Sequence, residues 1–323
     1  MHGQTSRLDG KVVVVTGASS GLGRAAALEF ARRRARVVVA ARGEAALEDT
    51  ARLCRESGAE SVAVPTDVTR EEDVARLVSQ ALDATGSIDV WVNNAGVTAF
   101  GTLADTPLEV HRRVLETNLW GAIHGARAVV PVFRRQGHGV LINVGSILSK
   151  VGQPFVPSYV ISKFALRGLS EALRSELADS PRIQICTLLP YAIDTPHFQV
   201  GANLVGREPH AMPPVQSPEH VARQLVSLAE QPRRELHVPR VAALGLALHA
   251  LFPRAVESAI HDSLSRWHFG AMQARDVDGN LLLPTSEPPQ IHGQRRPQLG
   301  FPSLVGWLLG HYGARGLRAL AGL

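Results

Sequence analysis

Residues 12–23 have the sequence VVVVTGASSGLG, and this stretch decides the fold. The run of four valines is typical of a strand that is buried on both faces of a sheet. The glycines that follow permit a tight turn, and the apolar-periodic stretch from Arg24 to Arg34 predicts a helix directly after that turn. A strand, a glycine turn and a helix in this order present free backbone N–H groups to a phosphate.

The alternation of strand and helix continues along the chain. Strands are predicted at residues 37–41, 61–65, 88–93, 140–144, 182–189 and 235–239, and helices at 44–56, 71–85, 107–136, 157–178 and 218–230. Such an alternation predicts a parallel sheet covered by helices. With right-handed crossovers, this becomes an α/β fold with a Rossmann-type doubly wound sheet.

The pattern changes after about residue 240. We expect a Rossmann domain at 1–240 and a mostly helical or irregular C-terminal extension at 241–323, whose role the sequence does not assign. Within it, a helical hairpin is predicted at 241–261. An irregular arm at 276–301 could lie over a neighbouring subunit or over the substrate cleft. For the apolar end at 303–323 we favour packing on protein over peripheral membrane contact, because its internal glycines weaken an interfacial helix.

Composition excludes several classes of protein. The net charge of +5 and the pI near 9.7 come from scattered arginines, so we expect no nucleic acid as a partner. The two cysteines, Cys54 and Cys186, predict neither a disulfide framework nor a zinc site, and we expect no bound metal. The sequence shows no signal-peptide pattern and no long apolar run, which favours a cytoplasmic protein. Among 34 basic residues only Lys11, Lys150 and Lys163 are lysines, so these are candidates for positions where arginine would not serve.

Further motifs follow the glycine turn at fixed places. They are Asp67-Val68 after the third strand, Asn93-Asn94-Ala95-Gly96 after the fourth, Asn118 in the long helix, Ser146 after the fifth strand, and Tyr159 and Lys163 on the next helix. Together with TGASSGLG at 16–23, their order and spacing resemble the short-chain dehydrogenase/reductase family, in its short form, across about residues 8–240.

Tyr159 and Lys163 are four residues apart on a predicted helix and therefore lie on one face. A tyrosine has an ordinary pKa near 10, and an adjacent ammonium favours the phenolate and lowers that pKa. The resemblance implies that Tyr159 is the acid/base and that Lys163 also binds the nicotinamide ribose. It further implies that Ser146 polarises the substrate oxygen and that Asn118 positions a water that relays protons.

The cofactor is expected to be NADP(H). An acid at the end of the second strand favours NAD, whereas Ala41 stands there and Arg42, a partner for the 2′-phosphate, follows it. The residues expected to bind the cofactor are Gly17, Ser19, Ser20, Gly21, Leu22, Gly23, Arg42, Asp67, Val68, Asn94, Ala95, Gly96, Tyr159, Lys163, Pro190, Ile193 and Thr195. One departure from the family is Tyr191, which replaces the usual glycine after Pro190 and leaves the local backbone conformation open.

The expected substrate is a small apolar carbonyl compound or alcohol. Its expected contacts are Ser146, Leu148, Phe155, Tyr159 and Phe198, with Ile147, Val151, Val200 and Leu204 nearby. The predicted function is that of an NADP(H)-dependent oxidoreductase that transfers hydride between nicotinamide and a ketone, aldehyde or secondary alcohol. The alternative is a non-catalytic NADP(H)-binding redox sensor. The resemblance also implies a homodimer or homotetramer.

Overall fold

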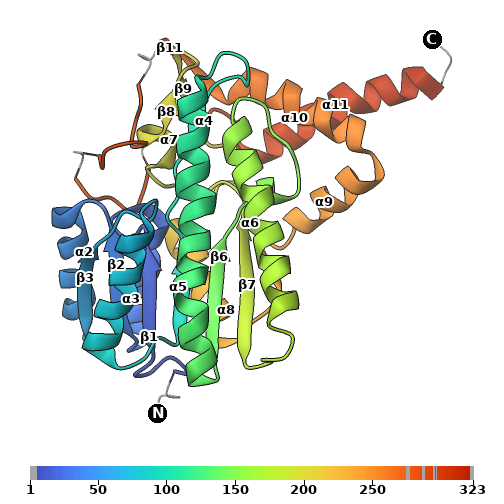
Figure 1. Cartoon of the computed structure of the whole chain (residues 1–323). Coiled ribbons are helices and arrows are strands. Elements are labelled where there is room, and N and C mark those ends of the chain that lie inside the picture. Colours follow the sequence, from blue (N-terminus) through green and yellow to red (C-terminus); the bar gives the residue numbers. More distant parts are fainter. Residues whose placement is uncertain (1–5, 274–276, 286–287, 294, 296, 321–323) are drawn as a thin grey trace, which may run out of the picture.

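A computed structural model describes residues 6–273, 277–285, 288–293, 295 and 297–320. Its centre is a seven-stranded parallel sheet in the order β10-β7-β6-β4-β1-β2-β3 (Figure 1). These strands are β1 (Val12–Thr16), β2 (Arg36–Ala41), β3 (Ser61–Pro65), β4 (Val90–Asn93), β6 (Gly139–Val144), β7 (Ile183–Pro190) and β10 (Glu235–Val238). Because the chain winds outward from β1 in both directions, the doubly wound Rossmann-type sheet is confirmed.

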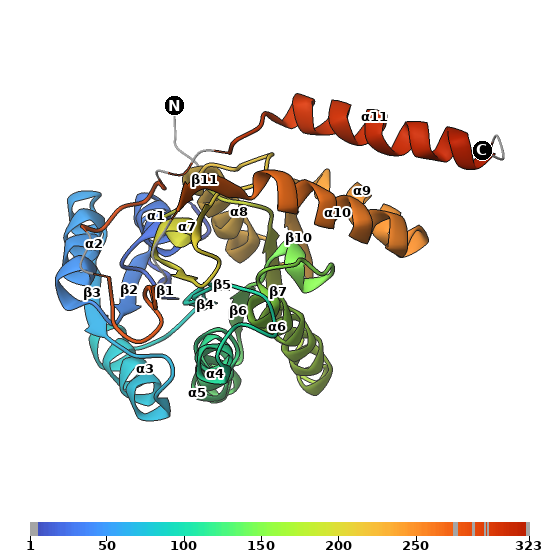
Figure 2. The same ribbon diagram turned by 90° about the horizontal axis from the view of Figure 1, so that it is seen from above.

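Helices cover both faces of the sheet, as the view from above shows (Figure 2). One face carries α1 (Gly21–Arg32), α2 (Glu44–Glu56) and α8 (Pro218–Glu230), and the other carries α3 (Glu71–Thr85), α5 (Gly121–Gln136) and α6 (Pro157–Glu176). The valines of β1 alternate between the two cores: Val13 and Val15 pack against the first layer, and Val14 packs against the second. A strand with both faces buried therefore needs the continuous valine run that the sequence has.

The observed helix ends differ from the predicted ones at two functional places. Helix α1 begins at Gly21 rather than Arg24, so the last glycines of the turn already belong to its first turn. The predicted helix at 107–136 is interrupted: α4 (Leu108–Leu115) continues through the π-helical turn η1 (Glu116–Trp120) into α5. Periodicity does not show a single wide turn, because one added residue changes the helical phase only locally.

Several short elements that the sequence did not indicate lie outside the central sheet, and one pair of them, β9 and β11, joins the C-terminal part to the rest of the protein. β5 (Ala99–Phe100) pairs with β8 (Ala202–Asn203), and β9 (Arg207–Pro209) pairs antiparallel with β11 (Phe269–Gln273). The short η2 (Ile147–Ser149) and α7 (His197–Val200) follow β6 and β7. Strands this short give no readable alternation, which explains why they were missed.

Beyond β10, the chain forms α9 (Ala242–Leu251), α10 (Pro253–Trp267) and, after the irregular segment, α11 (Phe301–Leu320). These helices project together from one end of the molecule (Figures 1 and 2). The predicted hairpin is present as α9 and α10, and the described residues between 277 and 300 contain no helix or named strand, in agreement with the predicted arm. In the described part of the chain, no helix combines the length and hydropathy needed to cross a bilayer.

Candidate active site

The glycine turn lies at the carboxyl end of β1 and is fixed by the segment after β4. The carboxamide of Asn94 donates hydrogen bonds to the carbonyls of Thr16 (2.8 Å) and Gly17 (3.2 Å). Gly17 has a φ of 66°, and a Cβ there would lie 2.7 Å from the Cα of Ala95. Only glycine meets both conditions, so this residue allows the two loops to approach each other.

A cleft of about 1030 Å³ opens at this edge of the sheet. It is lined by every residue predicted to bind the cofactor: Gly17, Ser19, Ser20, Gly21, Leu22, Gly23, Arg42, Asp67, Val68, Asn94, Ala95, Gly96, Tyr159, Lys163, Pro190, Ile193 and Thr195. The topology explains their convergence, because the carboxyl ends of parallel strands meet where the strand order reverses.

Ser146, Tyr159 and Lys163 face the same cleft. Ser146 precedes η2, where its hydroxyl accepts a hydrogen bond from the backbone N–H of Leu148 (3.1 Å). Tyr159 and Lys163 lie on α6, with the Lys163 ammonium 5.3 Å from the centre of the Tyr159 ring. The ammonium donates to the carbonyl of Val144 at the end of β6 (2.8 Å). The Ser146 hydroxyl, the Tyr159 phenol and the Lys163 ammonium therefore all lie along the same cleft.

Burial controls the protonation of this group. It raises the pKa of Tyr159 to about 12, although a hydrogen bond with Ser146 acts in the opposite direction. It lowers the pKa of Lys163 to about 8. In the chain alone the pKa of Tyr159 thus moves opposite to the direction expected from its lysine neighbour, because loss of hydration dominates. At neutral pH the phenol holds its proton.

Asn118 lies behind the cleft wall, in the π-helical turn η1. Its carboxamide accepts a hydrogen bond from the backbone N–H of Val97 (2.8 Å) and donates to the carbonyl of the same residue (2.9 Å). It also donates to the hydroxyl of Ser162, which is next to Lys163 (3.0 Å). π-turns occur often at functional sites, and here the turn brings a helix side chain to the loop after β4.

His197, at the start of α7, is a neighbour of Tyr159 that the sequence did not single out. Its ring centre lies 5.5 Å from that of Tyr159. Burial, together with the charge of Lys163, lowers the pKa of His197 to about 4. The imidazole is therefore neutral at physiological pH and adds no charge beside the phenol. No motif in the sequence marks this histidine.

The predicted substrate contacts divide into two groups. Leu148 and Phe198 line the cleft, as do Ile147, Val151 and Val200. Phe155 supports the wall from behind, where its ring packs edge-to-face on Phe269 with 5.1 Å between ring centres. Leu204 packs in a separate apolar cluster. Phe269 comes from β11 and joins the cluster around Tyr159.

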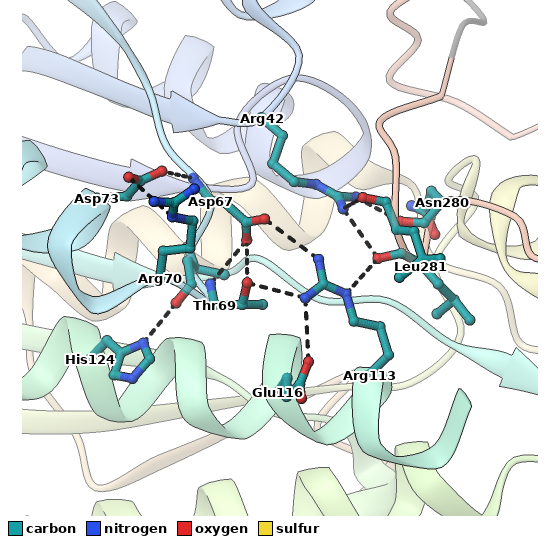
Figure 3. A network of polar contacts seen from close by, with 12 residues as sticks. Arg42, Asp67, Thr69, Arg70, Asp73, Arg113, Glu116, His124, Asn280 and Leu281 are labelled. Carbon is teal, nitrogen blue, oxygen red and sulfur yellow. Dashed lines mark hydrogen bonds and ion pairs between the residues drawn. The ribbon is translucent and has the colours of Figure 1, made fainter. Parts of the chain in front are cut away.

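The described residues of 277–293, which we name the strap, run beside the cofactor end of the cleft. Arg42 Nη2 donates to the carbonyl of Asn280 (2.6 Å), and Nη1 donates to the carbonyls of Leu281 (3.2 Å) and Leu282 (2.9 Å), as Figure 3 shows for the first two. Arg42 was expected to bind a 2′-phosphate, and the structure adds this second set of partners.

Arg113 of α4 holds the strap from the other side (Figure 3). Its Nε donates to the carbonyl of Leu281 (3.0 Å), while its other nitrogens contact Thr69 (3.2 Å) and Asp67 (3.5 Å). The side chain of Leu281 is 2% exposed, in a cluster with Val97 and other apolar residues. An apolar anchor and two arginines thus fix this part of the strap.

The far end of the strap reaches the glycine turn. The carbonyl of Gln290 accepts a hydrogen bond from the backbone N–H of Gly21, the first residue of α1 (2.8 Å). The next amides of α1, those of Leu22 and Gly23, have no carbonyl one turn earlier in the helix, and both residues line the cleft. The strap therefore shares the helix N-terminus that was predicted to bind a pyrophosphate.

Tyr191 fits without the left-handed backbone that its glycine counterpart would permit. Among the described non-glycine residues, only Arg34 and Phe155 have positive φ. The backbone N–H of Tyr191 donates to the carbonyl of Val238 (2.8 Å), and burial raises the pKa of its phenol to about 12. The conformation that the sequence left open is therefore an ordinary one.

A parallel doubly wound sheet with a glycine turn and a cleft at its switch point defines the class of dinucleotide-binding α/β proteins. The family profile described as "short chain dehydrogenase" matches residues 11–202. The chain belongs to the short-chain dehydrogenase/reductase family, and it is an oxidoreductase of that type.

The relatives with similar sequences include two that cover most of this chain. The oxidoreductase YxnA of Bacillus subtilis (strain 168), whose name includes the word uncharacterized, is 37% identical over 254 residues, which are 78% of this chain and 71% of the relative. The ketoacyl reductase HetN of Nostoc sp. is 30% identical over 271 residues, which are 82% of this chain and 91% of the relative.

Solved structures show the same fold. An alcohol dehydrogenase from Thermococcus sibiricus, complexed with 5-hydroxy-NADP, aligns with a TM-score of 0.62 and 29% identity over 70% of this chain and 95% of that one. A short-chain dehydrogenase/reductase from Burkholderia phymatum in complex with NAD aligns with a TM-score of 0.68 and 28% identity over 76% and 94%.

Proposed function

We propose that this protein is an NADP(H)-dependent oxidoreductase that transfers hydride between nicotinamide and a ketone, aldehyde or secondary alcohol. The observation that carries the proposal is the convergence of Ser146, Tyr159 and Lys163 on a cleft that also contains the glycine turn. A binding protein without turnover would have no need for a hydroxyl and a phenol that face the same cleft beside a buried ammonium.

The cleft fits a dinucleotide. The N-terminus of α1, the loop from Asn94 to Gly96, Ile193 and Thr195 all line it, with Thr195 next to Gly21 and Gly96 next to Lys163. The amides of α1 would hold the pyrophosphate, and Lys163 would hold the nicotinamide ribose. When bound, the nicotinamide supplies or accepts the hydride.

Tyr159 moves the proton. In reduction, its hydroxyl donates a proton to the substrate oxygen while Ser146 donates a hydrogen bond to the same oxygen. A phenol whose pKa burial raises to about 12 is fully protonated at neutral pH and is ready for this step. In oxidation, the Lys163 ammonium stabilises the phenolate, and the positive charge of a bound oxidised nicotinamide would act in the same direction.

Asn118 acts through its neighbours. Its bonds to Val97 and Ser162 fix the loop after β4 relative to α6. We propose that this arrangement also positions a water that relays protons from Lys163. In this proposal Asn118 is a positioning residue, because it orients the proposed water and the segments around it.

The preference for NADP(H) rests on Arg42. β2 ends at Ala41, without an acidic side chain to accept bonds from ribose hydroxyls, and the guanidinium that follows lines the cleft. Because one solved relative was crystallised with 5-hydroxy-NADP and another with NAD, the proposed preference depends on Arg42 alone. We place the boundary between the Rossmann domain and the extension at residue 240, just after β10.

The assembly that we propose is a homodimer or homotetramer. Large apolar side chains are exposed on the outer faces of the adjacent helices α4–α5 and α6. They are Leu108 at the start of α4, Trp120 before α5, and Ile161 and Phe164 on α6, with 44–67% of each exposed. Contact between two copies would remove these side chains from water.

A substrate screen tests the proposed reaction. Purified protein is assayed with aliphatic and aromatic ketones, aldehydes and secondary alcohols, each with both cofactors. We expect turnover with NADPH or NADP⁺, and a loss of about a hundredfold or more in kcat for Tyr159→Phe. Tyr191→Phe, which removes a hydroxyl from the same cleft, is the matched control. Binding of NADPH without turnover of any carbonyl compound would favour the redox sensor.

A further inference from the structure

The cleft extends beyond Ser146, Tyr159 and Lys163, the residues proposed to carry out the reaction. Beyond Tyr159 and Phe198 it continues between the three helices of the extension. The residues that line it there come from α9, α10 and α11 and from the two positions that flank α9, and they include Leu244, Leu248, Ala259, Leu264, Leu304 and Leu308. None of these side chains carries a formal charge. We name this part of the cleft the apolar gallery.

The gallery has two walls that are each one face of a helix. On α10 the lining residues recur at spacings of one and three, from Ala255 through Ala259 to Leu264. On α11 they recur at three, four and one, from Phe301 to Leu309. Such spacings mark a single helical face. The two helices contact each other through Trp267 and Trp307, whose ring centres are 4.7 Å apart.

Helix α9 forms an incomplete third wall. Its sequence AALGLALHAL contains no formally charged residue, yet none of its residues is buried. Leu244 and Leu248 both line the gallery and are 65% and 53% exposed. Exposed leucines at a concave, uncharged surface are unfavourable, and an apolar occupant of the gallery would cover them.

We propose that the gallery binds the apolar chain of the substrate, so that the substrate is a carbonyl compound or alcohol with a long alkyl or acyl chain. This inference rests on the proposed function, because the reactive carbon must lie at Tyr159. In reduction that carbon gains a hydride from the reduced nicotinamide, the oxygen gains the proton of Tyr159, and the cofactor leaves oxidised.

The continuity of the cleft favours a chain over other occupants. A flat protein surface or a bilayer surface would cover the outer side of α9, but neither would fill a groove that continues to the catalytic end. A flexible chain can follow the groove from Tyr159 to Leu309. Among the side chains that line the gallery, only those of Ser263 and Tyr312 are polar. An uncharged chain that binds there therefore removes few polar groups from water.

The test is a chain-length series of methyl ketones, from four to sixteen carbons, with NADPH in excess. We expect kcat/KM to rise by up to about fourfold for each added methylene until the gallery is filled, and then to level off. Displacement of the probe 1-anilinonaphthalene-8-sulfonate by the matching long-chain alcohol measures chain binding without turnover.

Two variants locate the effect. Ala259→Trp fills the gallery, and Ser258→Trp places the same side chain on the neighbouring exposed position of α10, outside the lining. We expect Ala259→Trp to reduce kcat/KM for the longest ketone about tenfold while the shortest ketone reacts at its usual rate, and Ser258→Trp to change neither. Leu248→Asn alters an exposed position, keeps the fold, and should weaken long-chain binding alone.

The outcomes separate the two proposals. A flat chain-length profile, with normal turnover of the short ketones, overturns the gallery and leaves the proposed function standing. No turnover of any ketone or alcohol, with long-chain alcohol still displacing the probe, overturns the reaction and not the gallery. A flat profile together with sedimentation on phosphatidylglycerol vesicles, lost in Leu248→Asn, would make α9 a membrane-docking surface and also overturns the proposal.

Discussion

Arg42 donates a hydrogen bond of 2.6 Å from Nη2 to the backbone carbonyl of Asn280, 238 residues later in the chain. The same guanidinium is the proposed partner of the cofactor's 2′-phosphate. One side chain therefore connects the cofactor end of the cleft to the strap. Carbonyl acceptors compensate part of the charge of a half-buried arginine, and they also set the direction in which it points.

Loosening the strap should weaken cofactor binding. Arg113→Ala removes the bond to the Leu281 carbonyl and the contact with Asp67, so the strap loses one of its two arginine partners. We expect the Kd for NADPH to rise about three- to tenfold, mainly through faster dissociation, as measured by the fluorescence of the bound cofactor. Arg112→Ala, an exposed neighbour on α4, should leave the Kd unchanged. Tighter binding in Arg113→Ala would mean that the strap competes with the cofactor.

Cofactor preference should follow the charge at position 42. Arg42→Asp replaces a phosphate partner with an acceptor for ribose hydroxyls, so the ratio of kcat/KM for NADPH to that for NADH should fall by about tenfold or more. Arg113→Ala separates the two roles of Arg42, because it weakens the strap and leaves the phosphate partner in place. A wild-type enzyme that already prefers NADH by a wide margin contradicts the assignment.

The central sheet could be predicted from the sequence because each buried strand is a continuous apolar run and each crossover helix shows a clear helical period. The sequence also allowed the proximity of Ser146, Tyr159 and Lys163 to be predicted, because the topology places the end of β6 and the start of α6 at the same edge of the sheet. The strap could not be predicted. Its contacts use backbone carbonyls, such as those of Asn280 and Leu281, which every residue has and which leave no mark in a sequence.

The rarity of lysine in the sequence identified one of the three lysines, Lys163, as a residue at a position that arginine would not fill. Lys163 lies where a fork-shaped guanidinium would not replace a compact ammonium, in agreement with its survival. Lys11 and Lys150, in contrast, form ion pairs with Asp89 (3.0 Å) and Glu235 (2.5 Å). An arginine could make such pairs, so nothing in the structure explains why these two positions keep lysine.

Removing the charge of Lys163 should stabilise the fold while it abolishes turnover. Burial lowers its pKa from 10.5 to about 8, and each pKa unit corresponds to about 1.4 kcal/mol, so the folded state carries a cost of about 3 kcal/mol at neutral pH. Loss of the hydrogen bond to Val144 offsets about 1 kcal/mol of the gain. We expect Lys163→Met to be more stable than wild type by about 1 to 2 kcal/mol in urea unfolding at pH 7.

The stability advantage of Lys163→Met over the wild type should depend on pH. Below pH 8 the lysine is protonated in both states and the cost is fully present. Between pH 8 and 10.5 the unfolded state binds more protons, so the wild type gains stability as the pH rises and the advantage of Lys163→Met shrinks. Lys11→Met, at a half-exposed site, is the control. An advantage that stays constant up to pH 10.5 would show that packing, not charge, is its cause.

The exposed apolar face of α6 should form the subunit interface. Phe164 is 44% exposed there, and Phe164→Glu would place a charge in an apolar contact. We expect sedimentation at micromolar concentration to show dimer or tetramer for the wild type and a smaller species for the variant. Val62→Glu changes a residue of 37% exposure on β3, at the opposite edge of the sheet, and should leave the assembly intact. A wild type that sediments only as a species of 34.7 kDa contradicts the interface.

The last prediction concerns truncation of the chain at Gln298, which removes α11. Leu304 is 7% exposed against Met212 and Leu264, and the hydroxyl of Tyr312 donates to Asp262 (2.5 Å). Because these contacts lie within the protein, their loss should lower Tm by about 3 °C or more, while binding to phosphatidylglycerol vesicles stays at background. Leu304→Ala keeps the helix and tests the packing alone, and it should produce part of the same decrease. Vesicle binding that is strong in the full chain and lost on truncation, with Tm unchanged, would instead identify α11 as a peripheral membrane anchor, since a helix that docks on lipid contributes nothing to stability in solution.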